Sequence, residues 1–130
     1  MNSFDYYLYH KLRMYWLGYN HYEVQEKEIG SRNKHCDNGR GIDVYVESIY
    51  QVVEQVYRKL KPRGYFCVVI GDSIYKDELI HMDDVYNEIA HRAGFVTKEV
   101  FSFDQRKYTR AFTPNLKTAE KKSHIMIFQK

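Results

Sequence analysis

One stretch of the sequence decides the fold, and it reads LKPRGYFCVVIGD over residues 60–72. It holds six consecutive apolar residues, 65–70, with Pro62 and Gly64 before them and Gly71 directly after them. A short, uninterrupted apolar run predicts a β-strand that is covered on both faces, as strands are in α/β sheets. The expected fold class is therefore α/β.

The segments around this strand predict two helices and two more strands. Residues 42–60 place apolar residues on one helix face, with acidic residues near the start and basic residues near the end, as the helix dipole favours. Residues 84–93 predict a second helix, with Asp83 as N-cap and Gly94 as the left-handed residue after it. Residues 96–103 and 123–129 predict closing strands that pair antiparallel, joined by a loop over 106–122.

The N-terminal part predicts a helix followed by a long loop. Residues 4–17 carry apolar side chains at helical spacing, with Asn2 or Ser3 as a suitable N-cap and Gly18 as a suitable stop. Residues 19–41 lack a clear period and are rich in Gly, Asn, Asp and Ser, so they predict a long loop. Residues 1–130 are expected to form a single partial domain.

Composition excludes several classes of protein. The chain has 130 residues, 44% of them hydrophobic and 28% charged, which is typical of a globular protein. It lacks the run of roughly 18 apolar residues that a membrane span needs, and no secretory signal is visible. Two cysteines, Cys36 and Cys67, predict a reducing compartment and a cytoplasmic location. His35 and Cys36 have only Asp37 nearby and lack the paired spacing of a zinc site, so no metal is expected.

A family resemblance begins at residues 60–72, which resemble the L-K-P-x-G helix–turn–strand passage of class I S-adenosylmethionine-dependent methyltransferases. Ala-Gly-Phe at 93–95 and the closing strand pair extend it. N-terminal passages resemble the group that methylates exocyclic base amino groups in DNA, the cytosine-N4/adenine-N6 type. These passages are NSFDYY at 2–7, HKLR at 10–13, WLG at 16–18 and EIGSR at 28–32.

The resemblance implies the C-terminal half of a Rossmann-like sheet, with a parallel strand, an antiparallel closing pair and flanking helices. In the family, a Gly-rich cofactor loop and a Pro-Pro-Tyr catalytic motif precede this region, and the resemblance places that motif just before Met1. The sequence has no Pro-Pro-Tyr, and its one Gly-x-Gly, at 39–41, follows a polar loop, which is weak evidence for a cofactor loop. S-adenosylmethionine is thus expected as cofactor of the complete domain and not of this chain alone, which supplies no catalytic residue.

Candidate site residues follow from the resemblance and from side-chain chemistry. Aromatic side chains beside the missing motif can stack on an unpaired base, and a turn at the carboxyl end of a strand is where α/β sheets collect ligands. The alternative for the turn is an Asp that caps the next segment. The substrate-pocket candidates are Asn2, Ser3, Phe4, Asp5, Tyr6, Asp72 and Ser73.

Basic side chains give the candidate nucleic-acid contacts. A net charge of +3 permits a nucleic-acid partner without requiring one. Clustered cations suit phosphate contact, and a solvated surface is the alternative. The residues are Lys11, Arg13, Arg106, Lys107 and Arg110.

The expected function is the C-terminal portion of a methyltransferase that modifies an exocyclic base amino group, with DNA as the expected partner. The implied reaction is in-line methyl transfer to a flipped base. The isolated chain is expected to be inactive, and its further partners are the missing N-terminal half or a second copy of the chain, with no membrane. Two alternatives stay open: part of a transfer-RNA guanine amino-methyltransferase, and a non-catalytic domain for nucleic-acid binding or subunit interaction.

Overall fold

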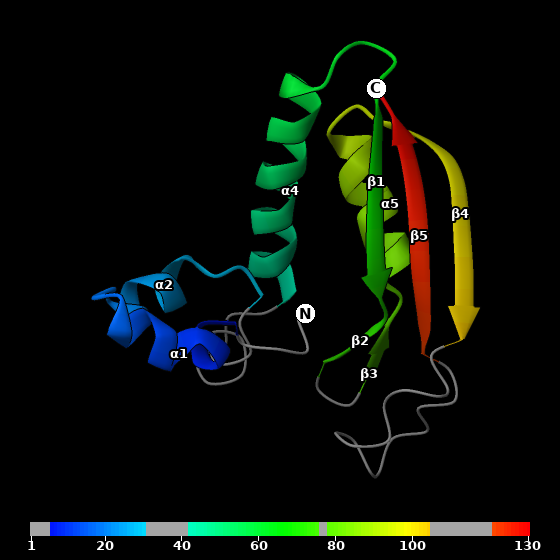
Figure 1. The fold of residues 1–130 in the computed structure, drawn as a ribbon. Coiled ribbons are helices and arrows are strands. Elements are labelled where there is room, and N and C mark those ends of the chain that lie inside the picture. Colours follow the sequence, from blue (N-terminus) through cyan, green and yellow to red (C-terminus); the bar gives the residue numbers. More distant parts are fainter. Residues whose placement is uncertain (1–5, 31–41, 76–77, 105–120) are drawn as a thin grey trace. The chain divides into compact units, whose positions relative to one another are not determined.

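The computed structural model describes residues 6–30, 42–75, 78–104 and 121–130 (Figure 1). The chain divides into two compact units, one ending at Ile49 and the other beginning at Tyr50, and each is described by itself. The elements are α1 (Tyr6–Trp16), α2 (His21–Lys27), α4 (Ile42–Lys59), β1 (Tyr65–Gly71), β2 (Ser73–Tyr75), β3 (Glu78–Ile80), α5 (Met82–Arg92), β4 (Val96–Asp104) and β5 (Lys122–Gln129).

The second unit is built on a three-stranded sheet in the order β1-β5-β4. Central β5 pairs antiparallel with both neighbours, so β1 and β4 run in the same direction on either side of it (Figure 1). The expected pairing of the two closing strands is confirmed. The parallel strand of a Rossmann-like sheet stays a prediction, because among the described strands β1 pairs with β5 alone. A separate antiparallel hairpin, β2-β3, follows β1.

One face of the sheet is covered by α5, and the core lies between them. The helix is tied to β4 through Thr97, whose hydroxyl contacts the side chains of Asn87 and His91. The rings of Phe66, Phe95 and Phe128 pack on one another under the helix, with centroid separations of 5.5–6.4 Å. Phe95 and Phe128 are buried, so this aromatic cluster anchors α5 to β1 and β5.

The opposite face of β1 is open, which corrects the expectation of a strand covered on both faces. Exposure alternates along β1, and Tyr65, Cys67 and Val69 are the exposed side chains. Val69 keeps 71% of its surface in contact with solvent. The side chains on both faces of β1 are therefore apolar, but α5 covers only one of these faces.

The turn between α4 and β1 explains the LKPRG sequence. A Cβ at Gly64 would lie 2.8 Å from Leu60 Cγ and 2.9 Å from the Lys61 carbonyl, so the chain is too crowded there for a side chain. Lys130 closes the same turn, because its Nζ donates to the carbonyls of Tyr57 (2.6 Å) and Leu60 (2.9 Å) at the end of α4. A cation in this position also suits the negative end of the helix dipole.

Helix α5 begins at Met82, two residues before the predicted start, and Asp83 is not its cap. The N-cap residue is His81, whose side chain makes no capping hydrogen bond. The Met82 N–H instead donates to the carboxylate of Asp72, ten residues earlier in the sequence. A distant residue thus replaces the local cap, which a local sequence pattern does not reveal.

The first unit contains α1 and α2, and α2 lies inside the segment predicted as a loop. Asn20 caps this short helix by accepting a hydrogen bond of 3.1 Å from the Tyr22 N–H. Seven residues are too few for a clear helical period, which is why the polar composition of the segment predicted a loop. Tyr7 and His21 are the buried residues of these helices. Residues 31–41 lie outside the described part of the chain.

In the described part of the chain, no helix is both long enough and apolar enough to cross a membrane.

We expect Gly94→Ala to destabilise the second unit by about 2–3 kcal/mol, because two costs add. Its φ of +100° is unfavourable for an L residue, and the new Cβ would lie 3.0 Å from the Tyr57 ring. Urea denaturation of Gly94→Ala, Tyr57→Leu and the double variant separates the costs. In the Tyr57→Leu background the cost should fall to about 1–2 kcal/mol, the backbone part alone. An unchanged cost would show that the ring contact contributes nothing.

Candidate functional site

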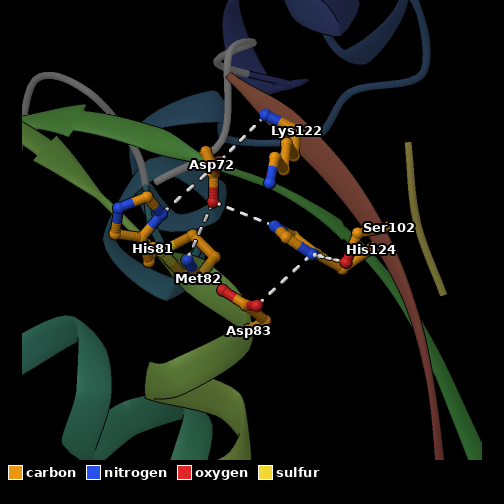
Figure 2. Close-up of polar contacts among 7 residues, drawn as sticks. All are labelled: Asp72, His81, Met82, Asp83, Ser102, Lys122 and His124. Carbon is orange, nitrogen blue, oxygen red and sulfur yellow. Dashed lines mark hydrogen bonds and ion pairs between the residues drawn. The ribbon is translucent and has the colours of Figure 1, made fainter. Parts of the chain in front are cut away.

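A cluster of polar side chains lies at the carboxyl end of β1, and Asp72 is at its centre (Figure 2). Asp72 is 4% exposed. Its Oδ1 accepts from the Met82 N–H (3.1 Å), and its Oδ2 accepts from the Lys122 N–H (2.9 Å). The Asp72 N–H in turn donates to the Lys122 carbonyl (2.8 Å). One carboxylate therefore joins the end of β1, the start of α5 and the start of β5.

His124 is the second buried member of the cluster, at 1% exposure. Its Nε2 lies 3.0 Å from Asp72 Oδ1, and because an ionised carboxylate only accepts, Nε2 carries the proton. Its Nδ1 lies 2.8 Å from Ser102 Oγ and 3.5 Å from Asp83 Oδ2. In the neutral imidazole Nδ1 accepts from the serine hydroxyl, and in the imidazolium it donates toward these oxygens.

The ionised form of Asp72 is held by these bonds. Burial opposes ionisation, but hydrogen bonds from the Lys122 N–H, from His124 and from the Met82 N–H outweigh it, and the pKa of Asp72 lies below its usual value of 3.8. The nearby His124 adds a favourable Coulombic contribution. The carboxylate is thus a stable anion that organises the donors around it.

The cluster also brings together three side chains that could ligate a metal ion. One ligand atom from each of Asp72, His81 and Asp83 lies within 4.8 Å of the others. Both oxygens of Asp72 already accept hydrogen bonds, however, and these bonds stabilise its negative charge without a metal ion. Asp83 Oδ1 is buried and has no hydrogen-bond partner among the described residues. The sequence-based expectation of no metal stays a prediction.

The structure describes only some of the predicted site residues. Asp72 and Ser73 are both buried, and Asp72 is bonded to its own fold as an anchor, in the manner of the capping alternative. Tyr6 begins α1, and its N–H donates to Glu28 Oε1 (2.8 Å). The other substrate-pocket candidates, Asn2, Ser3, Phe4 and Asp5, lie outside the described residues.

The expected position of the catalytic motif is not tested by the structure. Met1, just before which the resemblance places the Pro-Pro-Tyr motif, also lies outside the described residues. The position of that motif stays a prediction.

The structure also describes only some of the residues predicted to contact nucleic acid. Lys11 and Arg13 lie on α1, where Arg13 contacts His10 (3.2 Å) and stands 5.7 Å from the centroid of the Tyr9 ring. Arg106, Lys107 and Arg110 lie outside the described residues. The roles assigned to all these residues stay predictions.

Sequence reasoning missed His124, Ser102 and Asp83 as members of one cluster. Their positions in the chain are far apart, and only strand register brings Ser102 of β4 opposite His124 of β5. One signal was present: His124 directly precedes the apolar run 125–128 of the closing strand. A histidine on a buried strand face needs polar partners.

Comparison with solved structures shows the fold. The chain aligns with two structures of TTHA0409 from Thermus thermophilus, a protein assigned as a DNA modification methylase. The selenomethionine derivative aligns with TM-score 0.52 and 18% identity, and the complex with S-adenosylmethionine with TM-score 0.51 and 17% identity. Each alignment covers 68% of this chain and 37% of the methylase chain.

These likenesses show that the matched part of the chain has the same fold as the corresponding part of those methylase structures. The chain spans little more than a third of the methylase structures that it resembles. No protein-family model and no curated protein matches the sequence.

The described residues do not fit an S-adenosylmethionine site. A cofactor site of the Rossmann-like kind needs a Gly-rich turn between a strand and a helix. Here β1 leads instead into Asp72, whose carboxylate is engaged by Met82, Lys122 and His124, and then into the β2-β3 hairpin. One structural neighbour was solved with S-adenosylmethionine. The described residues of this chain do not form a Gly-rich turn that could bind that cofactor.

We expect Asp72→Asn to destabilise the chain by about 2–4 kcal/mol at neutral pH. The substitution removes a buried charge and turns one acceptor into a donor, where Met82, Lys122 and His124 all donate to the carboxylate. Since the folded pKa is lowered, the stabilisation is present above the ordinary pKa of 3.8 and is lost as the pH falls through the lower folded value. Urea denaturation across pH should show the two proteins converging in acid.

The matched control is Asp84→Asn, an exposed carboxyl in the first turn of the same helix. It should change stability by less than about 0.5 kcal/mol. A gap between the wild type and Asp72→Asn that persists unchanged in acid would contradict the role given to the carboxylate.

Proposed function

We propose that this chain is the C-terminal portion of an S-adenosylmethionine-dependent methyltransferase that modifies an exocyclic amino group of a base in DNA. The observation that carries the proposal is the agreement between sequence and topology. The residues that resemble the methyltransferase passage, 60–72, form the α4–turn–β1 unit, and the closing strands form the antiparallel β4-β5 pair beside it. The chain also aligns with a methylase fold.

The substrate class is supported by the surface of α1. Residues 6–16 include His10, Lys11 and Arg13 and no acidic residue. The same helix exposes aromatic and aliphatic side chains, among them Tyr9, Leu12 and Trp16, the last at 91%. Cations interleaved with exposed aromatic rings are the combination that contacts phosphates and stacks on unpaired bases.

The chemistry assigned to this chain is positioning. Methyl transfer to an amino nitrogen needs the base held in line with the donor, and a target base inside a duplex must first be flipped out. The chain has no Pro-Pro-Tyr motif and the described residues do not fit the cofactor, so it supplies no catalytic group by itself. Asp72 keeps the carboxyl end of β1 in a fixed geometry, and α1 supplies contacts to nucleic acid.

Two alternatives predict different outcomes. In the first alternative the chain is part of an enzyme that methylates a guanine amino group in transfer RNA, so the reaction is the same and the substrate is RNA. The chain would then bind structured RNA more tightly than duplex DNA at the same salt concentration. A non-catalytic binding or interaction domain would also use the fold. It would bind nucleic acid without ever contributing to methyl transfer.

Calorimetric titration of the isolated chain with S-adenosylmethionine should give no saturable binding in the micromolar range. The reason is that the described residues do not fit the cofactor and the sequence lacks the motif that accompanies it. Titration of the intact TTHA0409 methylase, which has been crystallised with the cofactor, is the positive control. Clear micromolar binding by the isolated chain would contradict both the proposal and the non-catalytic alternative.

Fluorescence anisotropy with duplex DNA should show salt-dependent binding that weakens in Lys11→Ala/Arg13→Ala. If each cation neutralises one phosphate, the slope of log K against log salt should fall by about 2. The control is Lys27→Ala/Lys59→Ala, which removes the same charge from exposed positions on α2 and α4. Equal losses in the two double variants would mean that α1 has no specific role.

A further inference from the structure

The start of helix α5 places a histidine and an aspartate beside Asp72 (Figure 2). One ligand atom from each of Asp72, His81 and Asp83 lies within 4.8 Å of the others. Side chains two residues apart on a helix do not face each other. His81 precedes the helix, however, and its backbone is extended, with φ −73° and ψ 102°. This conformation lets its ring lie near the side chain of Asp83.

Asp83 has one oxygen that is left without a donor. Its Oδ2 lies 3.5 Å from His124 Nδ1. Its Oδ1 is buried and has no hydrogen-bond partner among the described residues. Figure 2 shows that the oxygen not directed at His124 lies on the His81 side of the cluster. A buried carboxylate oxygen without a donor is costly, so it needs a proton, a water molecule or a cation.

The charge of the cluster favours a cation. Asp72 is held as an anion by the N–H groups of Met82 and Lys122, and the carboxylate of Asp83 lies close to it. Two like charges this close repel each other, more strongly where water is excluded. A water molecule would donate to the oxygen of Asp83 and leave both charges in place. A divalent cation would satisfy that oxygen and neutralise both carboxylates.

The hydrogen bonds of Asp72 are compatible with metal ligation. Its Oδ2 accepts from the Lys122 N–H and lies 3.9 Å from His81 Nδ1. A carboxylate oxygen has two lone pairs, so the bond from Lys122 leaves one for an ion. Carboxylates that ligate metals are themselves hydrogen-bonded, and these bonds fix their orientation. The bonds from Met82 and His124 to Oδ1 supply the same support.

His81 gives the cluster a ligand that can move. Its side chain makes no capping hydrogen bond to α5 and is 57% exposed. Ligands at about 2.0–2.2 Å from an ion lie about 3–4 Å from one another, so the cluster must contract slightly around an ion. Rotation of an exposed ring achieves this without disturbing the core. The exposed side also lets an ion enter from water and leaves coordination positions for water molecules.

The donor set selects the kind of metal. One imidazole nitrogen and two carboxylates form a mixed nitrogen and oxygen set. Magnesium and calcium prefer oxygen ligands alone, whereas zinc accepts both imidazole and carboxylate. Manganese also binds carboxylates, but the general order of affinities places Mn²⁺ below Zn²⁺. The set therefore favours Zn²⁺.

We propose that Asp72, His81 and Asp83 form a binding site for a divalent transition-metal cation, with Zn²⁺ preferred, which joins the start of α5 to the carboxyl end of β1. The site lies wholly within the second unit and uses no residue of α1, so it does not depend on the proposed substrate. The sequence-based expectation of no metal rests on the spacing around His35 and Cys36, which are not part of this site.

Calorimetric titration with zinc chloride tests the site in the full chain carrying Cys36→Ser and Cys67→Ser, because thiolates are zinc ligands. We expect one equivalent of Zn²⁺ to bind with micromolar affinity, Mn²⁺ to bind at least about tenfold more weakly, and Mg²⁺ to give no saturable binding. Excess Zn²⁺ should also raise the urea concentration at the midpoint of unfolding, because only the folded chain brings the three ligands together.

Two single variants locate the ion. His81→Ala and Asp83→Asn should each weaken Zn²⁺ binding by at least about tenfold, since even the loss of a residue that supports a ligand has an effect of this size. The controls are His91→Ala and Asp84→Asn, which change the same side chains at exposed positions on α5 and should leave the affinity unchanged. Because His81 is exposed, His81→Ala should fold normally, and circular dichroism checks this.

Two results would overturn the inference. The first is the absence of saturable Zn²⁺ binding by the folded chain, which would leave a proton or a water molecule to satisfy Asp83. The second is Zn²⁺ binding that is equally tight in His81→Ala, Asp83→Asn and the parent chain, since the ion would then occupy another place.

Discussion

The carboxylate of Asp72 is the interaction on which the rest of the second unit depends. Strand β1 ends directly before Asp72, and helix α5 and strand β5 begin within hydrogen-bond distance of its carboxylate, although they lie 10 and 50 residues further along the chain. The carboxylate is buried, and its negative charge is held by backbone N–H groups and by His124. Removing the carboxylate would leave these buried donors without an acceptor. The free-energy cost of an unsatisfied buried donor exceeds the net stabilisation that its hydrogen bond contributes.

This anchor fixes the carboxyl end of β1, the place where α/β folds gather their ligands. The side chains there serve the fold, and the described residues offer no cofactor cradle. The surface that remains available lies elsewhere: an apolar open face and edge in the second unit, and an exposed basic and aromatic helix in the first.

Most elements followed from local pattern. The spacing of residues 42–60 predicted α4 to within a residue, and the apolar run at 65–70 predicted β1. Helix α2 was missed because seven residues carry too little periodicity. The start of α5 was misplaced because its first N–H is capped by Asp72 rather than by a neighbour in sequence. Exposure along β1 was misjudged because an apolar pattern reports what a strand is suited to, not what covers it.

The sequence by itself determined the α/β class, the amphipathic helices, the two-sided apolar strand and the passages that resemble a methyltransferase. These are local properties, set by side-chain spacing and by the needs of glycine and proline at turns. Only the tertiary structure decided that Ser102, His124, Asp83 and Asp72 form one cluster, that β5 lies between β1 and β4, and that one sheet face stays open. These depend on register and on contacts between distant segments, and a buried charge acquires its partners only when the chain has folded around it.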